Sequence, residues 1–93
     1  MTLEKIKSEL LSVLHRYPIK HAAIFGSYSR NEQNESSDVD LLVEPSQSIT
    51  MFQLLRLEME LSESISRKVD VVEYNAIKSS MRTRVLAEAI TIL

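Results

Sequence analysis

The segment HAAIFGSYSRNEQNESSDVDLLV, residues 21–43, decides how this chain is expected to fold. Its first five residues, 21–25, form a short apolar run typical of a strand, and Gly26 and Ser27 stand where that strand ends and a helix begins. N–H groups at a helix N-terminus carry partial positive charge, and glycine has no Cβ to hold an anion away from the main chain. The pattern therefore predicts a phosphate-binding turn at Gly26 and Ser27.

Two acidic residues, Asp38 and Asp40, open a second apolar run that extends from Val39 to Val43. If this run is a strand, the two acids share a face, with their Cα atoms about 6.5 to 7 Å apart. At about 6 Å and an effective dielectric constant near 20, two carboxylates repel by about 3 kcal/mol, which favours a cation between them. Oxygen ligands of this kind suit Mg²⁺, which is usually completed by waters and substrate phosphates. The segment as a whole predicts nucleoside triphosphate chemistry.

Residues 26–32, GSYSRNE, and residues 37–43, SDVDLLV, together resemble the signature of the DNA polymerase β nucleotidyltransferase superfamily. That signature has Gly-Ser, ten or so residues, and then Asp-x-Asp on a strand. The chain is particularly similar to the minimal nucleotidyltransferases (MNT), which are the antitoxin partners of HEPN-domain toxins. Asn31 stands where the family commonly has glycine, and asparagine is among the few other residues that readily adopt left-handed angles.

The resemblance implies a metal site of three carboxylates. Asp38 and Asp40 would bridge two Mg²⁺ ions, and the family takes a third acid from the neighbouring strand. Asp70, in an expected strand over residues 69–73, matches that position and would lie beside the attacking hydroxyl. Glu73 is an alternative by sequence alone, but it lies at the end of the strand.

The resemblance also implies ATP as the substrate. Gly26 and Ser27 would contact its triphosphate with main-chain N–H groups and a hydroxyl, and Arg30 would neutralise the developing charge with its guanidinium. Two plainer alternatives remain open. Arg30 could be a solvated helix residue, and the polar run over residues 31–37 could be an ordinary loop.

Hydrophobic periodicity predicts helices on both sides of this segment. Helical spacing of apolar residues predicts a first helix over residues 2–16, with Thr2 as its N-cap and Pro18 just beyond its end. Thr50 and Gln53 have the spacing of a capping box, which predicts a second helix to about Ser66. We expect its buried side to contain Met51, Leu54, Leu55, Leu61 and Ile65, with Phe52 and Met59 at the margins.

The C-terminal segment, residues 75–93, is expected to contain an amphipathic helix and a short strand. The apolar side of this helix would be formed by Ile77, Met81, Val85 and Leu86, and residues 89–93 would be a fourth strand or the tail of the helix. The predicted architecture is an α/β (α+β) nucleotidyltransferase fold. A small mixed sheet of three to four strands is flanked by helices, in one domain over residues 1–93, with the site at one end of the first three strands.

Composition excludes several other classes of function. The chain has 93 residues and no cysteine, which excludes a disulfide scaffold and a thiolate metal site. No apolar run has membrane-spanning length, so a cytoplasmic protein is expected. The net charge of -2 and the scattered basic residues argue against direct nucleic-acid binding. His15 and His21 stand outside any cluster of acids and are expected to be surface or packing residues.

The expected acceptor is a protein, because 93 residues leave no second domain to bind an acceptor. The MNT resemblance implies transfer of AMP from ATP to a tyrosine hydroxyl of a HEPN RNase toxin, which inactivates it. Two alternatives remain: a non-catalytic antitoxin that neutralises its toxin by binding, and a nucleotidyltransferase acting on a small hydroxylated molecule. Against the first, a pure binder needs none of the five residues Gly26, Ser27, Asp38, Asp40 and Asp70.

Overall fold

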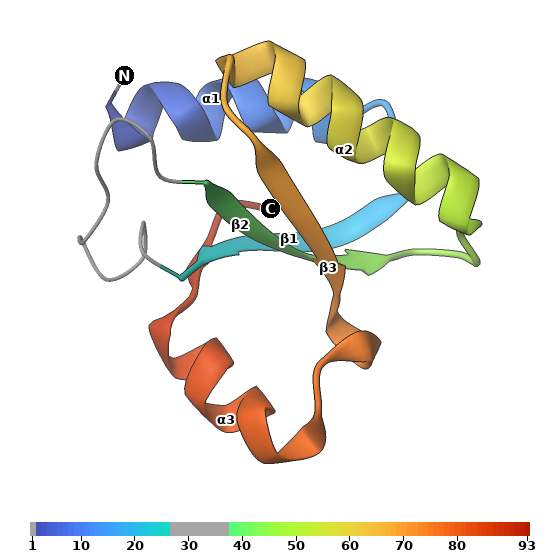
Figure 1. Ribbon diagram of the computed structural model, residues 1–93, viewed down its shortest axis with the longest axis vertical. Coiled ribbons are helices and arrows are strands. Elements are labelled where there is room, and N and C mark those ends of the chain that lie inside the picture. The colour runs from blue at the N-terminus through green and yellow to red at the C-terminus, as the bar shows by residue number, and fades with distance from the viewer. Residues whose placement is uncertain (1, 27–37) are drawn as a thin grey trace.

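The computed structural model describes residues 2–26 and 38–93, and its centre is a four-stranded sheet (Figure 1). The strands lie in the order β3-β2-β1-β4; β1 is antiparallel to β2 and β4, and β2 is parallel to β3. In chain order the elements are α1 (Leu3–Leu14), β1 (Ile19–Phe25), β2 (Val39–Pro45), α2 (Met51–Ile65), β3 (Val69–Glu73), the 3₁₀ turn η1 (Tyr74–Ala76), α3 (Ser79–Glu88) and β4 (Ile90–Thr91). The predicted α/β (α+β) fold with a mixed sheet is confirmed.

The two long helices begin where the sequence predicts. The Thr2 hydroxyl accepts a hydrogen bond from the Lys5 N–H at 3.2 Å, which caps α1. At the start of α2, Thr50 and Gln53 form a reciprocal capping box, with each side chain accepting from the other residue's N–H at 3.0 and 2.9 Å. Helix α1 ends at Leu14, about three residues before the end near Tyr17 that Pro18 predicts, because the chain already turns over residues 15–18.

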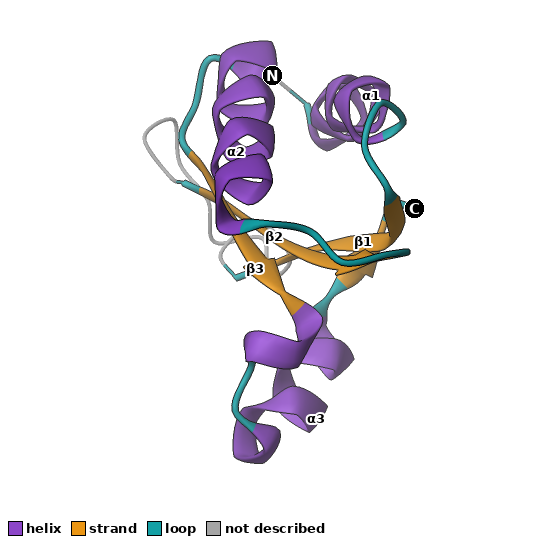
Figure 2. Ribbon diagram, turned by 90° about the vertical axis from the view of Figure 1, so that its right-hand side faces the viewer, coloured by secondary structure: helices purple, strands orange, loops and turns teal. Residues whose placement is uncertain are grey.

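Helices α1 and α2 lie together over one face of the sheet, which we call the covered face (Figure 2). Alternate strand residues point into this layer, so the covered face carries the hydrophobic core. Its buried residues are Ile6, Leu10, Val13, Leu14, Ala22, Ile24, Val39, Leu41, Val43, Leu57, Leu61, Ile65 and Val69.

The predicted buried side of α2 is partly wrong. Leu61 and Ile65 are buried as expected, but Met51 and Leu55 are 70% and 52% exposed, and the buried Leu57 was not predicted. Helix α2 has two apolar stripes, and only the one containing Leu54, Leu57, Leu61 and Ile65 contacts the sheet and α1. The other stripe, Met51, Phe52, Leu55 and Met59, is exposed.

The opposite side of the sheet, which we call the open face, has much thinner cover. Helix α3 lies on this side and away from the strands in Figures 1 and 2, and none of its residues is buried. It begins at Ser79, so Ile77 precedes it, and Met81 and Leu86 are about half exposed. The predicted helix is thus present but excludes Ile77, and the apolar side predicted for it is not buried. The predicted fourth strand is confirmed as the short β4, which pairs with β1.

In the part of the chain that the structure describes, no helix has both the length and the apolar character needed to cross a membrane.

Candidate functional site

The strand directions bring the predicted acids and glycine to one edge of the sheet. Because β1 is antiparallel to β2, its end at Phe25 meets the start of β2, where Phe25 pairs with Asp40. Because β2 and β3 are parallel, their first residues lie together, and Asp40 pairs with Asp70. Three neighbouring strands thus align Phe25, Asp40 and Asp70 in one row on the open face, with Gly26 directly after Phe25.

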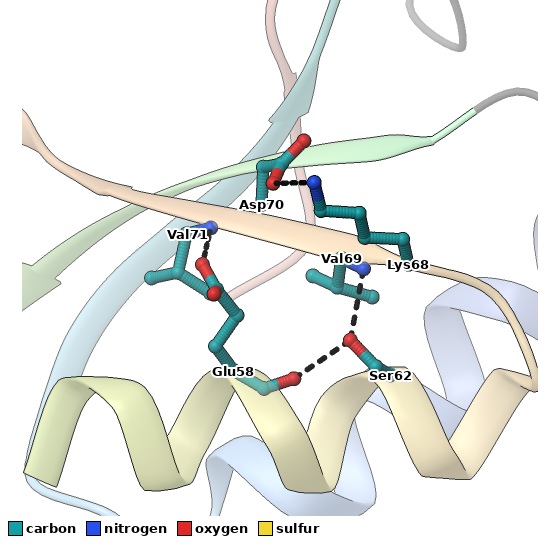
Figure 3. Close-up of polar contacts among 6 residues, drawn as sticks. All are labelled: Glu58, Ser62, Lys68, Val69, Asp70 and Val71. Atoms are coloured by element: carbon teal, nitrogen blue, oxygen red, sulfur yellow. Dashed lines mark hydrogen bonds and ion pairs between the residues drawn. The ribbon is translucent and has the colours of Figure 1, made fainter.

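Asp40 and Asp70 are side by side on adjacent strands, which lie about 4.8 Å apart in such a sheet. Both are half-buried, so their like charges oppose each other in a medium less polar than water. The structure places a counter-charge beside one of them, since the Lys68 Nζ lies 3.6 Å from the Asp70 Oδ1 (Figure 3). The sequence prediction named both carboxylates and overlooked Lys68, which precedes the strand.

Asp38 precedes β2 and is exposed. Among residues 2–26 and 38–93, no three acidic or histidine side chains gather closely enough to hold a single ion. The backbone supplies the register that places Asp40 beside Asp70, and the hard oxygen donors are of the type that Mg²⁺ prefers. The donor set therefore fits a divalent cation in kind, and its ligation by all three carboxylates stays a prediction.

Gly26 has two structural reasons to be glycine. Its φ of +75° lies in the left-handed region, which L-residues with a Cβ adopt at a cost. A Cβ at this position would also collide with the Asp40 carboxylate. The sequence suggested only the approach of a phosphate, whereas the structure adds that the missing Cβ leaves room for a predicted metal ligand.

The edge strand β3, which carries Asp70, is fixed by two polar side chains of α2 (Figure 3). Glu58 accepts a hydrogen bond from the Val71 N–H at 2.8 Å, and the Ser62 hydroxyl accepts one from the Val69 N–H at 2.9 Å. Four residues of helix rise about 6 Å and two residues of strand about 6.6 Å, so the spacing of the two pairs matches. These contacts satisfy the N–H groups of Val69 and Val71, which point away from β2. They therefore fix the strand on both sides of Asp70.

Sequence reasoning missed Glu58 and Ser62. The available signal was their spacing of four residues on the side of α2 that also carries Leu54, Leu61 and Ile65. A polar pair beside an otherwise apolar stripe indicates backbone groups that need partners.

Ser27, Arg30 and Asn31 lie outside the described residues, as does the helix predicted to begin near Ser27. Their predicted contacts with the triphosphate remain predictions. His15 and His21 are both exposed and neither joins the row of acids, in agreement with the sequence prediction.

Comparison with known proteins identifies the family. Residues 4–93 match the family described as "Polymerase beta, Nucleotidyltransferase". The chain belongs to this family. It is 42% identical over 93 residues to the "Putative protein adenylyltransferase MJ0435" of Methanocaldococcus jannaschii, covering all of both chains. It is 33% identical over 94 residues to the "Protein adenylyltransferase MntA" of Thermococcus cleftensis, covering 97% of this chain and 95% of that one.

Solved structures place this nucleotidyltransferase in the same fold. A structure described as a "putative minimal nucleotidyltransferase" aligns with a TM-score of 0.84 at 33% identity, covering 97% of this chain and 95% of the other. A chain from a toxin-antitoxin crystal structure with AMP-PNP aligns with a TM-score of 0.83 at 19% identity over 94% and 72% of the chains. A chain from a complex of a tri-AMPylated Shewanella oneidensis HEPN toxin with an MNT antitoxin gives 0.78 at 16% over 99% and 72%. The last two are similar in fold, and the family and enzyme class predicted from the sequence are confirmed.

Proposed function

We propose that this nucleotidyltransferase is the antitoxin of a toxin-antitoxin pair and transfers AMP from ATP to a tyrosine hydroxyl of a HEPN RNase toxin, which it thereby inactivates. The observation that carries the proposal is the pairing of Asp40 with Asp70 directly beside Gly26, because it joins two carboxylates to a glycine turn at one sheet edge. The names of the relatives support the reaction, since one is named a protein adenylyltransferase and the other a putative protein adenylyltransferase. The HEPN complex of similar fold supports the class of partner.

Asp38, Asp40 and Asp70 are the residues that would hold two Mg²⁺ ions. When bound, such ions supply charge neutralisation for the attacking and leaving oxygens of a phosphoryl displacement. In this chain Lys68 pairs with Asp70, and Asp70 would have to give up that pair, at least in part, to hold a metal ion. Asp40 is the central ligand of the proposal because it lies between Asp70 and the glycine turn.

The proposed step is an in-line displacement at the α-phosphorus of ATP. The tyrosine oxygen forms a bond to the α-phosphorus, the bond to the bridging oxygen of the β-phosphate breaks, and pyrophosphate leaves. Asp70 accepts the proton of the tyrosine hydroxyl. Gly26 and Ser27 bind the triphosphate through N–H and hydroxyl groups, and Arg30 neutralises the charge that develops on the leaving group.

A folded protein acceptor suits the open arrangement of this edge. Asp70 and Asp40 are half-buried on an open sheet face, so a second protein can present a hydroxyl there. Attack requires the hydroxyl oxygen within about 3 to 3.5 Å of the α-phosphorus, which docking of a rigid partner provides. The added phosphodiester places negative charge near the RNase site and repels RNA.

The test is the intact mass of the HEPN partner after co-expression with this chain. The wild-type chain is expected to add one or more AMP-sized increments, and Asp40→Asn is expected to add none. Without metal, Asp40→Asn should be as stable as the wild type or slightly more so, since one of two repelling charges is removed. Thermal unfolding of both proteins checks this. An unmodified partner with wild-type protein, or equal increments with Asp40→Asn, would contradict the proposal and favour an antitoxin that acts by binding.

A further inference from the structure

The open face of the sheet contains a cleft next to the row of acids. The cleft has a volume of about 220 Å³ and is lined by residues of the strands, of η1 and of α3. Its floor includes Ala23, Leu42 and Thr91, and its walls include Tyr74 of η1 and Leu86 of α3. Its lining is predominantly apolar, with His21 and Glu44 at the end away from Asp40.

The strand register connects this cleft to the acidic row. Leu42 follows Asp40 by two residues, so both point to the open face, about 6.6 Å apart along β2. Ala23 pairs with Leu42, and Thr91 pairs with Ala23, so the cleft floor is a second row parallel to the first. Leu42 is buried but lies outside the core on the covered face. The Leu42 side chain on the open face is thus screened from water, and it lies directly beside Asp40, the proposed metal ligand.

We propose that this cleft holds the base of the nucleoside triphosphate whose α-phosphate lies at Asp40 and Asp70. The inference rests on the proposed function in taking ATP as the nucleotide. A ribose and its 5′-oxygen separate an α-phosphorus from the glycosidic nitrogen by about the distance between the two rows. The triphosphate end points to Gly26 at the sheet edge, so the nucleoside is directed inward over Leu42.

The size and chemistry of the cleft fit a single base. Its volume is below the range of about 300 to 1,000 Å³ usual for complete small-molecule sites, so it takes the base and leaves the phosphates outside. A tyrosine among apolar side chains is a suitable surface for stacking a planar heterocycle. Tyr74 is held in place by Arg82, whose guanidinium carbon lies 5.3 Å from the ring centroid and whose Nε donates to the Ile77 carbonyl at 3.2 Å.

Helix α3 supplies both a test position and its matched control. Leu86 lines the cleft and is 46% exposed, whereas Met81 is 51% exposed on the same helix and is not among the lining residues. Leu86→Gln and Met81→Gln therefore make similar changes at similar exposure, and only the first alters the cleft. Tyr74→Ala removes the ring, and Tyr74→Phe keeps it.

The experiment measures binding of ATP and of inorganic tripolyphosphate, each with Mg²⁺, by calorimetry. We expect Tyr74→Ala to raise the Kd for ATP about tenfold and Leu86→Gln several-fold, with Tyr74→Phe and Met81→Gln unchanged. The Kd for tripolyphosphate should be the same in all five proteins. Unchanged ATP binding by Tyr74→Ala and Leu86→Gln would overturn the inference, and so would an equal loss of ATP and tripolyphosphate.

The partner mass measurement separates this inference from the proposed function. If ATP binding depends on Tyr74 while the HEPN partner stays unmodified, the base subsite stands and the proposed acceptor is wrong. If the partner is modified while ATP binding is indifferent to Tyr74 and Leu86, the proposed function stands and the base subsite is wrong.

Discussion

The two faces of the sheet differ in what they bury. On the covered face, Ile24, Leu41 and Val43 are fully buried beneath α1 and α2. On the open face, Asp40 and Asp70 remain half-buried, and α3 buries none of its own residues. Alternation along β2 assigns neighbouring residues to opposite faces, so one short strand contributes both to the core and to the candidate site. Stability and chemistry are therefore separable in this small fold.

The contrast within α2 gives the sharpest test of this separation. Leu57 faces the core and is fully buried, whereas Leu55 is 52% exposed on the same helix. We expect Leu57→Ala to lower the free energy of unfolding by about 2 to 5 kcal/mol, because it removes buried apolar contacts and leaves a cavity. Leu55→Ala should change it by less than about 0.5 kcal/mol. Urea denaturation of both variants measures the difference.

A similar loss of stability in both variants would break the distinction between the two stripes of α2. It would mean that Leu55, with Met51, Phe52 and Met59, is covered in solution. Repeating the denaturation across a range of protein concentrations identifies such cover by a second copy, because the midpoint then rises with concentration.

A second prediction concerns Gly26, which directly follows β1 and lies against the open-face carboxylate of Asp40. Gly26→Ala should lower the free energy of unfolding by about 1 to 2 kcal/mol from its left-handed φ alone. It should also displace the Asp40 carboxylate, since the new Cβ occupies its place, and AMP transfer should fall strongly.

A double-mutant cycle divides the Gly26 effect into these two parts. In an Asp40→Ala background the collision is absent, so Gly26→Ala should cost less stability than in the wild type, by the contribution of the collision. Equal costs in the two backgrounds would show that Gly26 is needed only for its backbone angle. The measurement is chemical denaturation of the four proteins.

The same contrast explains how far the sequence predicted the molecule. The strands and the N-caps Thr2 and Thr50 were predictable, because strand alternation and helix capping are local signals. The sheet edge that carries the candidate site follows from the ends of those strands, as at Val39. The buried side of α2 was not, since apolar residues occupy two of its sides and only the position of the sheet selects Leu57 over Leu55. For α3 the apolar residues occur at helical spacing, but Met81 is 51% exposed and no residue of the helix is buried.

The candidate site divides in the same way. Asp40 and Asp70 were predictable by motif and strand position, and their pairing in register follows from strand direction. Lys68 is local, two residues before Asp70, and was overlooked. The spacing of Glu58 and Ser62 indicates a polar pair that needs backbone partners, but it does not say that Glu58 reaches Val71 of β3. The cleft beside Leu42 depends on where α3 lies, which is likewise a long-range property.

The smallest expected effect is a pH dependence at the margin of the covered face. Tyr17 packs against the core, and this partial burial raises the pKa of its hydroxyl above the ordinary value of 10.0. The hydrogen bond that the hydroxyl donates to Glu60, and the charge of that carboxylate, raise it further. Glu60 is itself held by Arg16 at 3.2 Å and Arg56 at 3.5 Å.

The raised pKa makes stability fall as the pH rises above about 10. Below that pH the tyrosine is neutral in both folded and unfolded chains and has no effect on the pH dependence. Above it, the unfolded tyrosine loses its proton while folded Tyr17 keeps it, so the unfolded state is favoured until the pH passes the folded-state pKa. Tyr17→Phe removes this contribution, and its Tm should fall less than that of the wild type between pH 9 and pH 11. Parallel Tm curves would show that Tyr17 titrates alike in both states and is not sheltered by the covered face.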